Sequence, residues 1–182
     1  MTTRNLSANL LGREVAVEYS GNAIAYAILT LRVAMGWIFF QAGIEKVLDP
    51  EWTAAGYLQF AIHENNPFSA LWANFAGSPT IDLLVQYGLV LTGVGIILGA
   101  LLRWNAIWAA MMMIFFWASA LQGGLSEGLP LAHGWVIDDH IVYAALVFGL
   151  GAIGAGRISG VDAALERTRL VQNNAWLKYI LG

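Results

Sequence analysis

Long apolar runs alternate with short polar stretches along this chain, and four of the runs are as long as a membrane-spanning helix. Such a helix needs about 20 largely apolar residues. The runs cover residues 22–46, 80–101, 104–123 and 139–157. Lipid leaves no backbone polar group unpaired, and the alternating ten-residue segments of a membrane barrel are absent. The pattern therefore predicts four spanning α-helices.

The composition supports a membrane protein of the all-α class. Of its 182 residues, 58% are hydrophobic and only 12% are charged, and the mean hydropathy is +0.62. Soluble domains are far more polar. We expect one integral membrane domain over residues 1–182, a four-helix bundle with outer loops at 47–79 and 124–138 and a tail at 158–182. The first twenty residues lack the apolar core of a removable signal peptide.

The distribution of cations predicts the orientation of the bundle. Lysine and arginine near helix ends concentrate on the cytoplasmic side. With both termini in the cytoplasm, Lys46 alone lies outside, and seven cations lie inside: Arg4, Arg13, Arg103, Arg157, Arg167, Arg169 and Lys178. The chain is therefore expected to be a multi-pass protein of a prokaryotic plasma membrane, and its net charge of −3 gives no indication of a nucleic-acid partner.

Two amphipathic segments are expected to lie at the membrane surfaces. Residues 51–64 can form a short helix on the outer surface, either as an aromatic belt in the headgroup region or as a lid over a ligand pocket. In the tail, residues 161–168 repeat apolar positions at helical spacing. This pattern indicates an amphipathic helix on the inner surface, with docking to a partner protein as the alternative.

Arg32 stands inside the first apolar run and needs a partner. At 100° per residue it shares a stripe with Gly36, Phe39, Gly43 and Lys46, and the glycines would let another helix approach closely. Arg32 should thus face protein. A charge at the centre of a spanning helix costs about 2.5–3.5 kcal/mol on insertion scales.

The partner of Arg32 remains open at this point. Arg32 is expected near mid-membrane, whereas the candidate carboxylates gather at the outer end. Backbone carbonyls or the side chains of Gln41, Gln86 or Tyr87 are therefore alternative partners. Arg32 is either purely structural or also contacts a polar headgroup or redox cofactor. On the second helix, the small residues Gly95 and Gly99 of "GIILG" predict a close helix contact.

The outer end of the fourth helix carries the sequence Asp138-Asp139-His140. One aspartate can cap the helix, while a second carboxylate next to an imidazole suggests proton transfer. No histidine pair lies on facing helices, so no haem is expected, and without cysteine the chain cannot hold an iron–sulfur cluster through thiolates. The spacing matches no metal motif, and no metal site is predicted.

Three stretches together resemble the DoxX/DoxD family, from about residue 27 to 168. They are "LRVAMGWIFFQAGIEKVLDP", "GVGIILGALLR" and "DDHIVYAALVFGLGAIGAGRISGVDAAL". The "DDHIVY" start of the last helix is closer to the DoxD branch. The resemblance implies a four-helix membrane subunit of a thiosulfate:quinone oxidoreductase, with polar positions of the family at Arg32, Glu45, Lys46, Arg103, Asp138, Asp139 and His140.

These observations lead to three hypotheses. In the first, the chain belongs to a quinone-linked oxidoreductase and passes electrons from thiosulfate or another sulfur compound to membrane quinone. His140, Asp139 and Asp138 would then relay protons, and Arg32, Gln41, Glu45 and Lys46 would bind the quinone or a polar headgroup. In the second, it is a non-catalytic accessory or assembly subunit of a respiratory complex. In the third, it is a small transporter that works as an oligomer. The first two imply partner subunits.

Overall fold

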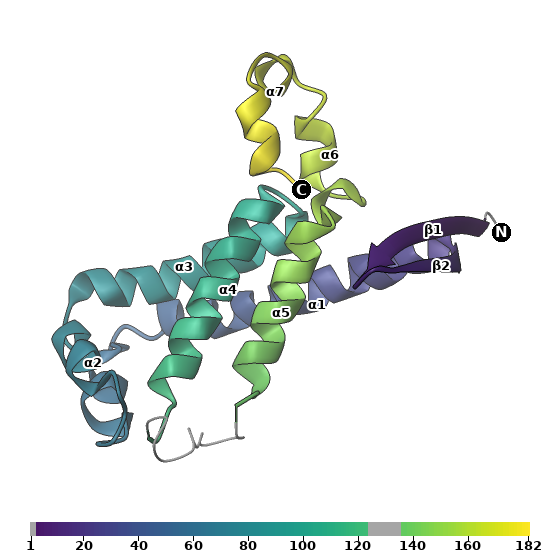
Figure 1. Ribbon diagram of the computed structural model, residues 1–182. Helices are drawn as coiled ribbons and strands as arrows, with labels where there is room; N and C mark the ends of the chain where they lie inside the picture. Colours follow the sequence, from purple (N-terminus) through teal and green to yellow (C-terminus); the bar gives the residue numbers. More distant parts are fainter. Residues whose placement is uncertain (1–2, 124–135) are drawn as a thin grey trace.

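The computed structural model describes residues 3–123 and 136–182 of the chain (Figure 1). Helices occupy the main part of each predicted run. They are α1 (Gly21–Leu48), α3 (Pro79–Leu98), α4 (Leu102–Ser119) and α5 (Asp139–Ala152). The prediction of a mainly helical chain is confirmed.

The four long helices form two antiparallel pairs. α1 packs along α3, and α4 packs along α5, while the contacts between the pairs are fewer. In Figure 1 the α1/α3 pair runs across the α4/α5 pair. The shared core contains Met35, Phe39, Leu89, Met112 and Val147, all nearly or completely buried.

Glycines let α1 and α3 approach each other, as the Arg32 stripe predicted. A Cβ added to Gly36 would lie 2.6 Å from Ile97 Cγ1, and one added to Gly43 would lie 2.6 Å from the Val90 backbone nitrogen. Such distances leave no room for a side chain. On α3 the matching residue is Gly93, whose added Cβ would collide with the backbone of Phe40.

The predicted close helix contact at Gly95 and Gly99 is confirmed, because each glycine lies against a side chain of another helix, Asn105 of α4 and Arg32 of α1. Gly99 ends α3 with a φ of 63°, a conformation that glycine adopts without steric cost. Gly95 thus leaves room for the start of α4, while Gly99 also allows the turn into that helix.

Among the described residues, two helices, α1 and α3, are long and apolar enough to cross a membrane. Only 22% of the most apolar window of each is buried, so most of their apolar surface faces outward. Such a surface suits lipid. α4 is not apolar enough to meet the same criterion, and α5 is an apolar helix of only 14 residues.

Strands precede the first helix, which the all-α expectation did not include. β1 (Thr3–Leu10) and β2 (Arg13–Ser20) form an antiparallel hairpin, with Leu11 and Gly12 at positive φ in its turn. β2 leads directly into α1, whose first turn is capped by the Ser20 hydroxyl. The hairpin projects beside the start of α1 (Figure 1).

The segment between α1 and α3 folds into two short helices. A π-helical turn, η1 (Tyr57–Ala61), falls within the predicted surface helix of residues 51–64, and α2 (Ser69–Phe75) follows. We call residues 49–78 the outer segment. The helix predicted at 51–64 is therefore present as one turn only.

The amphipathic helix predicted at residues 161–168 is present as one short helix only. After the 3-10 turn η3 (Ala155–Arg157), the tail contains three short helices: α6 (Val161–Leu165) and α7 (Arg169–Asn173) are α-helical, and η4 (Ala175–Tyr179) is 3-10. The chain is interrupted because Gly154 takes a φ of 67° and Asp162 turns back to bind the start of α4. A continuous helix could not make these contacts.

Candidate functional site

A cavity of about 510 Å³ lies between the outer segment and helices α1, α3 and α4. Its size falls within the usual range of small-molecule sites. Most of the surface is aromatic or aliphatic, and a few polar side chains interrupt it. The described lining residues are Lys46, Trp52, Thr53, Ala54, Tyr57, Leu58, Trp72, Phe75, Ile81, Leu84, Val85, Trp108, Met111, Met112, Phe115, Phe116 and Ser119.

Buried Asn66 fastens the outer segment over this cavity. It is 3% exposed, and its amide nitrogen donates to three carbonyls at the end of α4, at distances of 2.8–3.1 Å. Its amide oxygen accepts hydrogen bonds from the Phe68 backbone and the Trp72 indole. The carbonyls at a helix end have no hydrogen-bond donor within the helix. The Asn66 amide therefore supplies donors to the carbonyls at the end of α4.

A second attachment joins the outer segment to α3. The carboxylate of Asp82 accepts hydrogen bonds from the Thr53 hydroxyl and the Ala54 backbone N–H, both at 2.8 Å. Asp82 lies in the first turn of α3, where a negative charge is favourable. The outer segment is thus held at both sides of the cavity. Of its two predicted roles, the structure favours the lid over a pocket.

Lys46 brings a positive charge to the cavity wall. Its ammonium group donates to the Ala42 carbonyl at 2.8 Å and lies 5.7 Å from the centre of the Trp52 ring. Of the described residues that line the cavity, it is the only cation, and none is acidic. A lysine has three N–H donors, so Lys46 keeps donors for a ligand oxygen.

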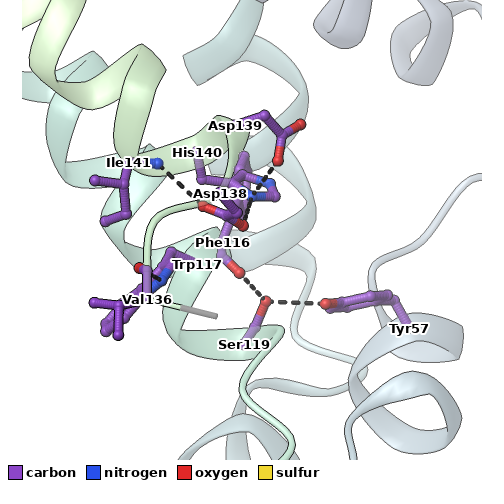
Figure 2. A network of polar contacts seen from close by, with 9 residues as sticks. All are labelled: Tyr57, Phe116, Trp117, Ser119, Val136, Asp138, Asp139, His140 and Ile141. Carbon is purple, nitrogen blue, oxygen red and sulfur yellow. Dashed lines mark hydrogen bonds and ion pairs between the residues drawn. The ribbon is translucent and has the colours of Figure 1, made fainter. Parts of the chain in front are cut away.

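Tyr57 and Ser119 form a hydroxyl pair on the cavity wall (Figure 2). Their oxygens are 3.0 Å apart, and the Ser119 hydroxyl donates to the Phe116 carbonyl at 2.7 Å. Because serine has one hydroxyl proton, Tyr57 must be the donor in the pair. The tyrosine oxygen then retains the capacity to accept a hydrogen bond from a ligand.

The predicted acidic and imidazole residues do meet at the start of α5 (Figure 2). Asp138 is the N-cap: one of its oxygens accepts from the Ile141 N–H at 3.2 Å, and the other lies 2.8 Å from His140 Nδ1. Asp139 lies farther from the same nitrogen, at 3.4 Å, and its side chain is 56% exposed. The predicted cap is therefore confirmed and assigned to Asp138, which also binds the imidazole.

The bond to Asp138 fixes the tautomer of His140. An ionised carboxylate only accepts hydrogen bonds, so a neutral imidazole must carry its proton on Nδ1 and leave Nε2 as a base. The ring packs edge-on against Phe116, with ring centres 6.2 Å apart. Since Phe116 lines the cavity, His140 stands directly behind the cavity wall.

Ligand atoms of Asp138, Asp139 and His140 lie within 4.8 Å of one another, a spacing that a metal ion would fit. Two of the three already bind each other, and Asp138 also caps the helix. Helix capping and the histidine pair account for this cluster. His133 lies outside the described residues.

The four residues predicted to bind a cofactor do not converge. Lys46 lines the cavity, whereas Gln41 and Glu45 are exposed and hydrogen-bond each other at 3.0 Å. Arg32 precedes Lys46 by fourteen positions, about 21 Å along α1 at 1.5 Å per residue. Of this predicted set, the structure brings only Lys46 to the cavity.

Arg32 is 1% exposed, and its partners are backbone carbonyls. Its guanidinium donates to Ala155 at 2.6 Å, to Ile158 at 2.7 Å and to Ser159 at 3.4 Å. The prediction that it faces protein is confirmed. These carbonyls follow the end of α5, at the opposite end of the structure from the cavity.

Asp162 was missed by the sequence analysis. It is fully buried near Arg32, and its carboxylate accepts from the backbone N–H groups of Leu101 and Leu102 at the start of α4, and from that of Gly182. Its position at the start of α6, after a glycine, resembled an ordinary helix start. Asn66 was missed for a similar reason, since Asn-Pro is a frequent turn sequence.

The fold and site define a helical membrane-associated protein with a ligand-sized apolar cavity at one end. The chain belongs to the DoxX family, whose sequence pattern matches residues 27–122. This stretch contains every described residue that lines the cavity, while Asp138 and His140 lie beyond it. No curated protein and no solved structure matches the chain.

Proposed function

We propose that the chain is a DoxD-like membrane subunit of a quinone-linked oxidoreductase, with the quinone ring in the cavity beside Lys46. The observation that carries this proposal is the cavity itself. Its aromatic walls, single cation and hydroxyl pair match a flat apolar ring that carries carbonyl oxygens. In this arrangement α1, α3, α4 and α5 all cross the membrane, with both termini in the cytoplasm.

The residues of the cavity fit a quinone chemically. A bound quinone would accept two electrons and two protons. Lys46 would donate a hydrogen bond to one quinone oxygen, which favours negative charge there as electrons arrive. The Tyr57 hydroxyl, linked to Ser119, would orient the ring. Trp52, Trp72 and Phe115 would exclude water from both faces.

Asp138 and His140 would exchange protons with the outer aqueous phase. His140 Nε2 is free to take up a proton while Asp138 stabilises the resulting imidazolium. The imidazole is one aromatic ring away from the cavity, across Phe116. The proposed relay therefore uses Asp138 as the orienting carboxylate, and the more exposed Asp139 is secondary.

The electrons would come from a partner subunit. The chain contains no cysteine and thus no thiolate for an iron–sulfur cluster. Thiosulfate or another sulfur compound is the donor that the family resemblance implies. The sequence offers no second redox group that would let the chain act alone.

One observation favours the accessory-subunit alternative. The N-terminal half of α1 exposes large apolar residues beside the hairpin, including Ile24, Tyr26 and Leu31, which are 44%, 70% and 45% exposed. Two strands alone are marginally stable in water. A partner subunit that packs against the hairpin and this part of α1 would stabilise both.

Tryptophan fluorescence tests the proposed quinone site. Trp52, Trp72 and Trp108 line the cavity, so a short-chain benzoquinone added to the purified protein in nanodiscs should quench part of the emission saturably. Lys46→Gln should weaken this binding about tenfold, as expected for the loss of a charged hydrogen bond. Gln41→Ala, on the exposed face of the same helix, is the matched control. Quenching that does not saturate, or equal affinity in both variants, would contradict the proposal.

A further inference from the structure

A second polar region lies at the opposite end of the structure, where the tail returns to the start of α4. The Arg103 guanidinium donates to the Lys178 carbonyl at 3.2 Å, and the Trp104 backbone N–H donates to the Ile180 carbonyl at 3.3 Å. These two bonds place residues 178–180 beside residues 103–104. Two cations far apart in the sequence thus become neighbours.

A third cation joins them through Glu166. Arg157 binds this carboxylate through two nitrogens, at 2.6 and 2.9 Å. The pKa of Glu166 is lowered, first by the hydrogen bond from Arg157 and further by the charges of Arg157, Lys178 and Arg103. One carboxylate therefore faces three cations, which leaves this surface with excess positive charge.

The two buried charges nearby, Asp162 and Arg32, are opposite in sign and add no net charge to this surface, although the pKa of Arg157 is raised first by its hydrogen bond to Glu166 and also by the Asp162 carboxylate. Asp162 is fully buried next to Arg32, and its carboxylate accepts hydrogen bonds from three backbone N–H groups. The surface cations are accessible: the Arg157 side chain is 40% exposed, and Lys178 is exposed as well. An anion could reach them without unfolding any element.

The surroundings of the three cations suit the edge of a bilayer. The apolar helix α4 starts at this point, α5 has ended a few residues before Arg157, and exposed aromatic side chains flank the cations. Trp104, Trp176 and Tyr179 are 47%, 61% and 79% exposed. Tryptophan and tyrosine beside lysine and arginine, at the ends of apolar helices, are typical of the headgroup region.

We propose that Arg103, Arg157 and Lys178 bind the headgroup of an anionic phospholipid in the cytoplasmic leaflet. Arginine and lysine side chains donate to phosphate oxygens, and the adjacent aromatic rings would lie beside the first segments of the acyl chains. An acidic partner protein is the competing occupant. The aromatic residues and the adjacent apolar helices favour lipid. The proposal rests on the membrane-spanning arrangement of the proposed function and is independent of quinone.

Native mass spectrometry of the full chain tests this site. The protein is reconstituted in nanodiscs of equal parts phosphatidylcholine and phosphatidylglycerol, released into mild detergent, and the retained lipids are counted. The wild type should retain phosphatidylglycerol preferentially. Lys178→Gln should lower this preference about fivefold, the factor expected for one cation near an anionic surface. Arg103→Gln combined with Lys178→Gln should lower it further.

Two further variants decide between a specific site and general charge. Arg4→Gln combined with Arg13→Gln removes two cations from the hairpin and should leave lipid retention unchanged. Glu166→Gln removes the one carboxylate of the site and should raise retention of phosphatidylglycerol. The proposal would be overturned if the hairpin variant lost as much phosphatidylglycerol as the site variants, or if Glu166→Gln retained less of it. It would also be overturned if lipid retention stayed unchanged in the site variants while a co-purifying protein was lost. Benzoquinone quenching at the distant cavity should stay normal, so failure of one proposal is separable from failure of the other.

Discussion

The cavity end and the Arg32 end of this chain both bury polar groups in apolar surroundings, and they do so for different purposes. At the Arg32 end, the guanidinium meets three carbonyls and Asp162 meets three N–H groups. At the cavity end, the Lys46 ammonium group makes one hydrogen bond to the described residues, to the Ala42 carbonyl, and it borders the cavity. The bonds of Arg32 and Asp162 to distant backbone groups hold separate elements together, although the Arg32 Nε is buried without a partner. The spare donors of Lys46 border the cavity and are available to a ligand.

Arg32→Leu should have the largest effect on stability, and it acts at the Arg32 end of the structure. The substitution leaves three carbonyls and buried Asp162 without their cation, so we expect a loss of about 3–5 kcal/mol in the free energy of unfolding. The measurement is the detergent-solubilised unfolding midpoint. Arg13→Leu, on the exposed hairpin, should change stability by less than about 0.5 kcal/mol. Similar small effects in both variants would contradict a structural role for Arg32.

Asn66→Ala should have the next largest effect, because it connects fold and cavity. It leaves three carbonyls at the end of α4 unpaired, at a cost of about 1–3 kcal/mol. We also expect weaker benzoquinone quenching, since the outer segment would be released from α4. Asn65→Ala removes the exposed neighbouring amide and should change neither property. Normal quenching in Asn66→Ala would show that the outer segment does not shape the ligand site.

Gly36→Ala tests the packing of α1 against α3, which joins the two ends of the structure. Its Cβ would collide with Ile97, so we expect a loss of about 1–3 kcal/mol. Gly149→Ala, on α5, meets nothing within 4 Å and should stabilise by up to about 1 kcal/mol through helix propensity. Unfolding midpoints of the two variants should therefore shift in opposite directions.

Tyr57→Phe should have a smaller effect, limited to the cavity end. Loss of the hydrogen bond to Ser119 costs about 1 kcal/mol, and benzoquinone affinity should fall up to about fivefold. Tyr179→Phe, on the exposed tail, serves as the control in the same quenching titration. A stronger effect of the tail variant would contradict the assignment of Tyr57 to the ligand site.

The Arg157–Glu166 pair should give the smallest effect, visible only as a pH dependence. The pKa of Glu166 lies below its ordinary value of 4.5 in the folded chain. The pair therefore stabilises the protein at neutral pH, and this contribution is lost as the pH falls through the lowered pKa. Unfolding midpoints of the wild type and Glu166→Gln should differ slightly at pH 7 and converge as the pH falls through the lowered pKa of Glu166. A difference that grows on acidification would contradict the assignment.

The sequence predicted the helices well because their signal is local. Long apolar runs located α1, α3, α4 and α5, and the Arg32 stripe identified the face of α1 that packs on α3. The tail was only partly predicted, because a fixed turn at Gly154 and the contacts of Asp162 depend on parts of the chain far away. Hairpin residues 3–20 gave no apolar pattern strong enough to predict strands.

The candidate site was only partly predictable for the same reason. Asp138 and His140 are neighbours in the sequence, so their contact could be foreseen. The cavity combines α1, α3, α4 and the outer segment, and no local pattern indicates which aromatic residues would meet. Gln41 and Glu45 were grouped with Lys46 by polarity, but helical geometry turns them to the exposed face.

Photoaffinity labelling is the most direct test of the proposed quinone site. The full chain in nanodiscs would be irradiated with an azido-benzoquinone, and the labelled peptides would be mapped by mass spectrometry. Labels are expected on residues 46–58 and 108–119, and excess unlabelled quinone should suppress them while Lys46→Gln should weaken them. Labels spread evenly over the outward faces of α1 and α3, without competition, would contradict the proposed quinone site.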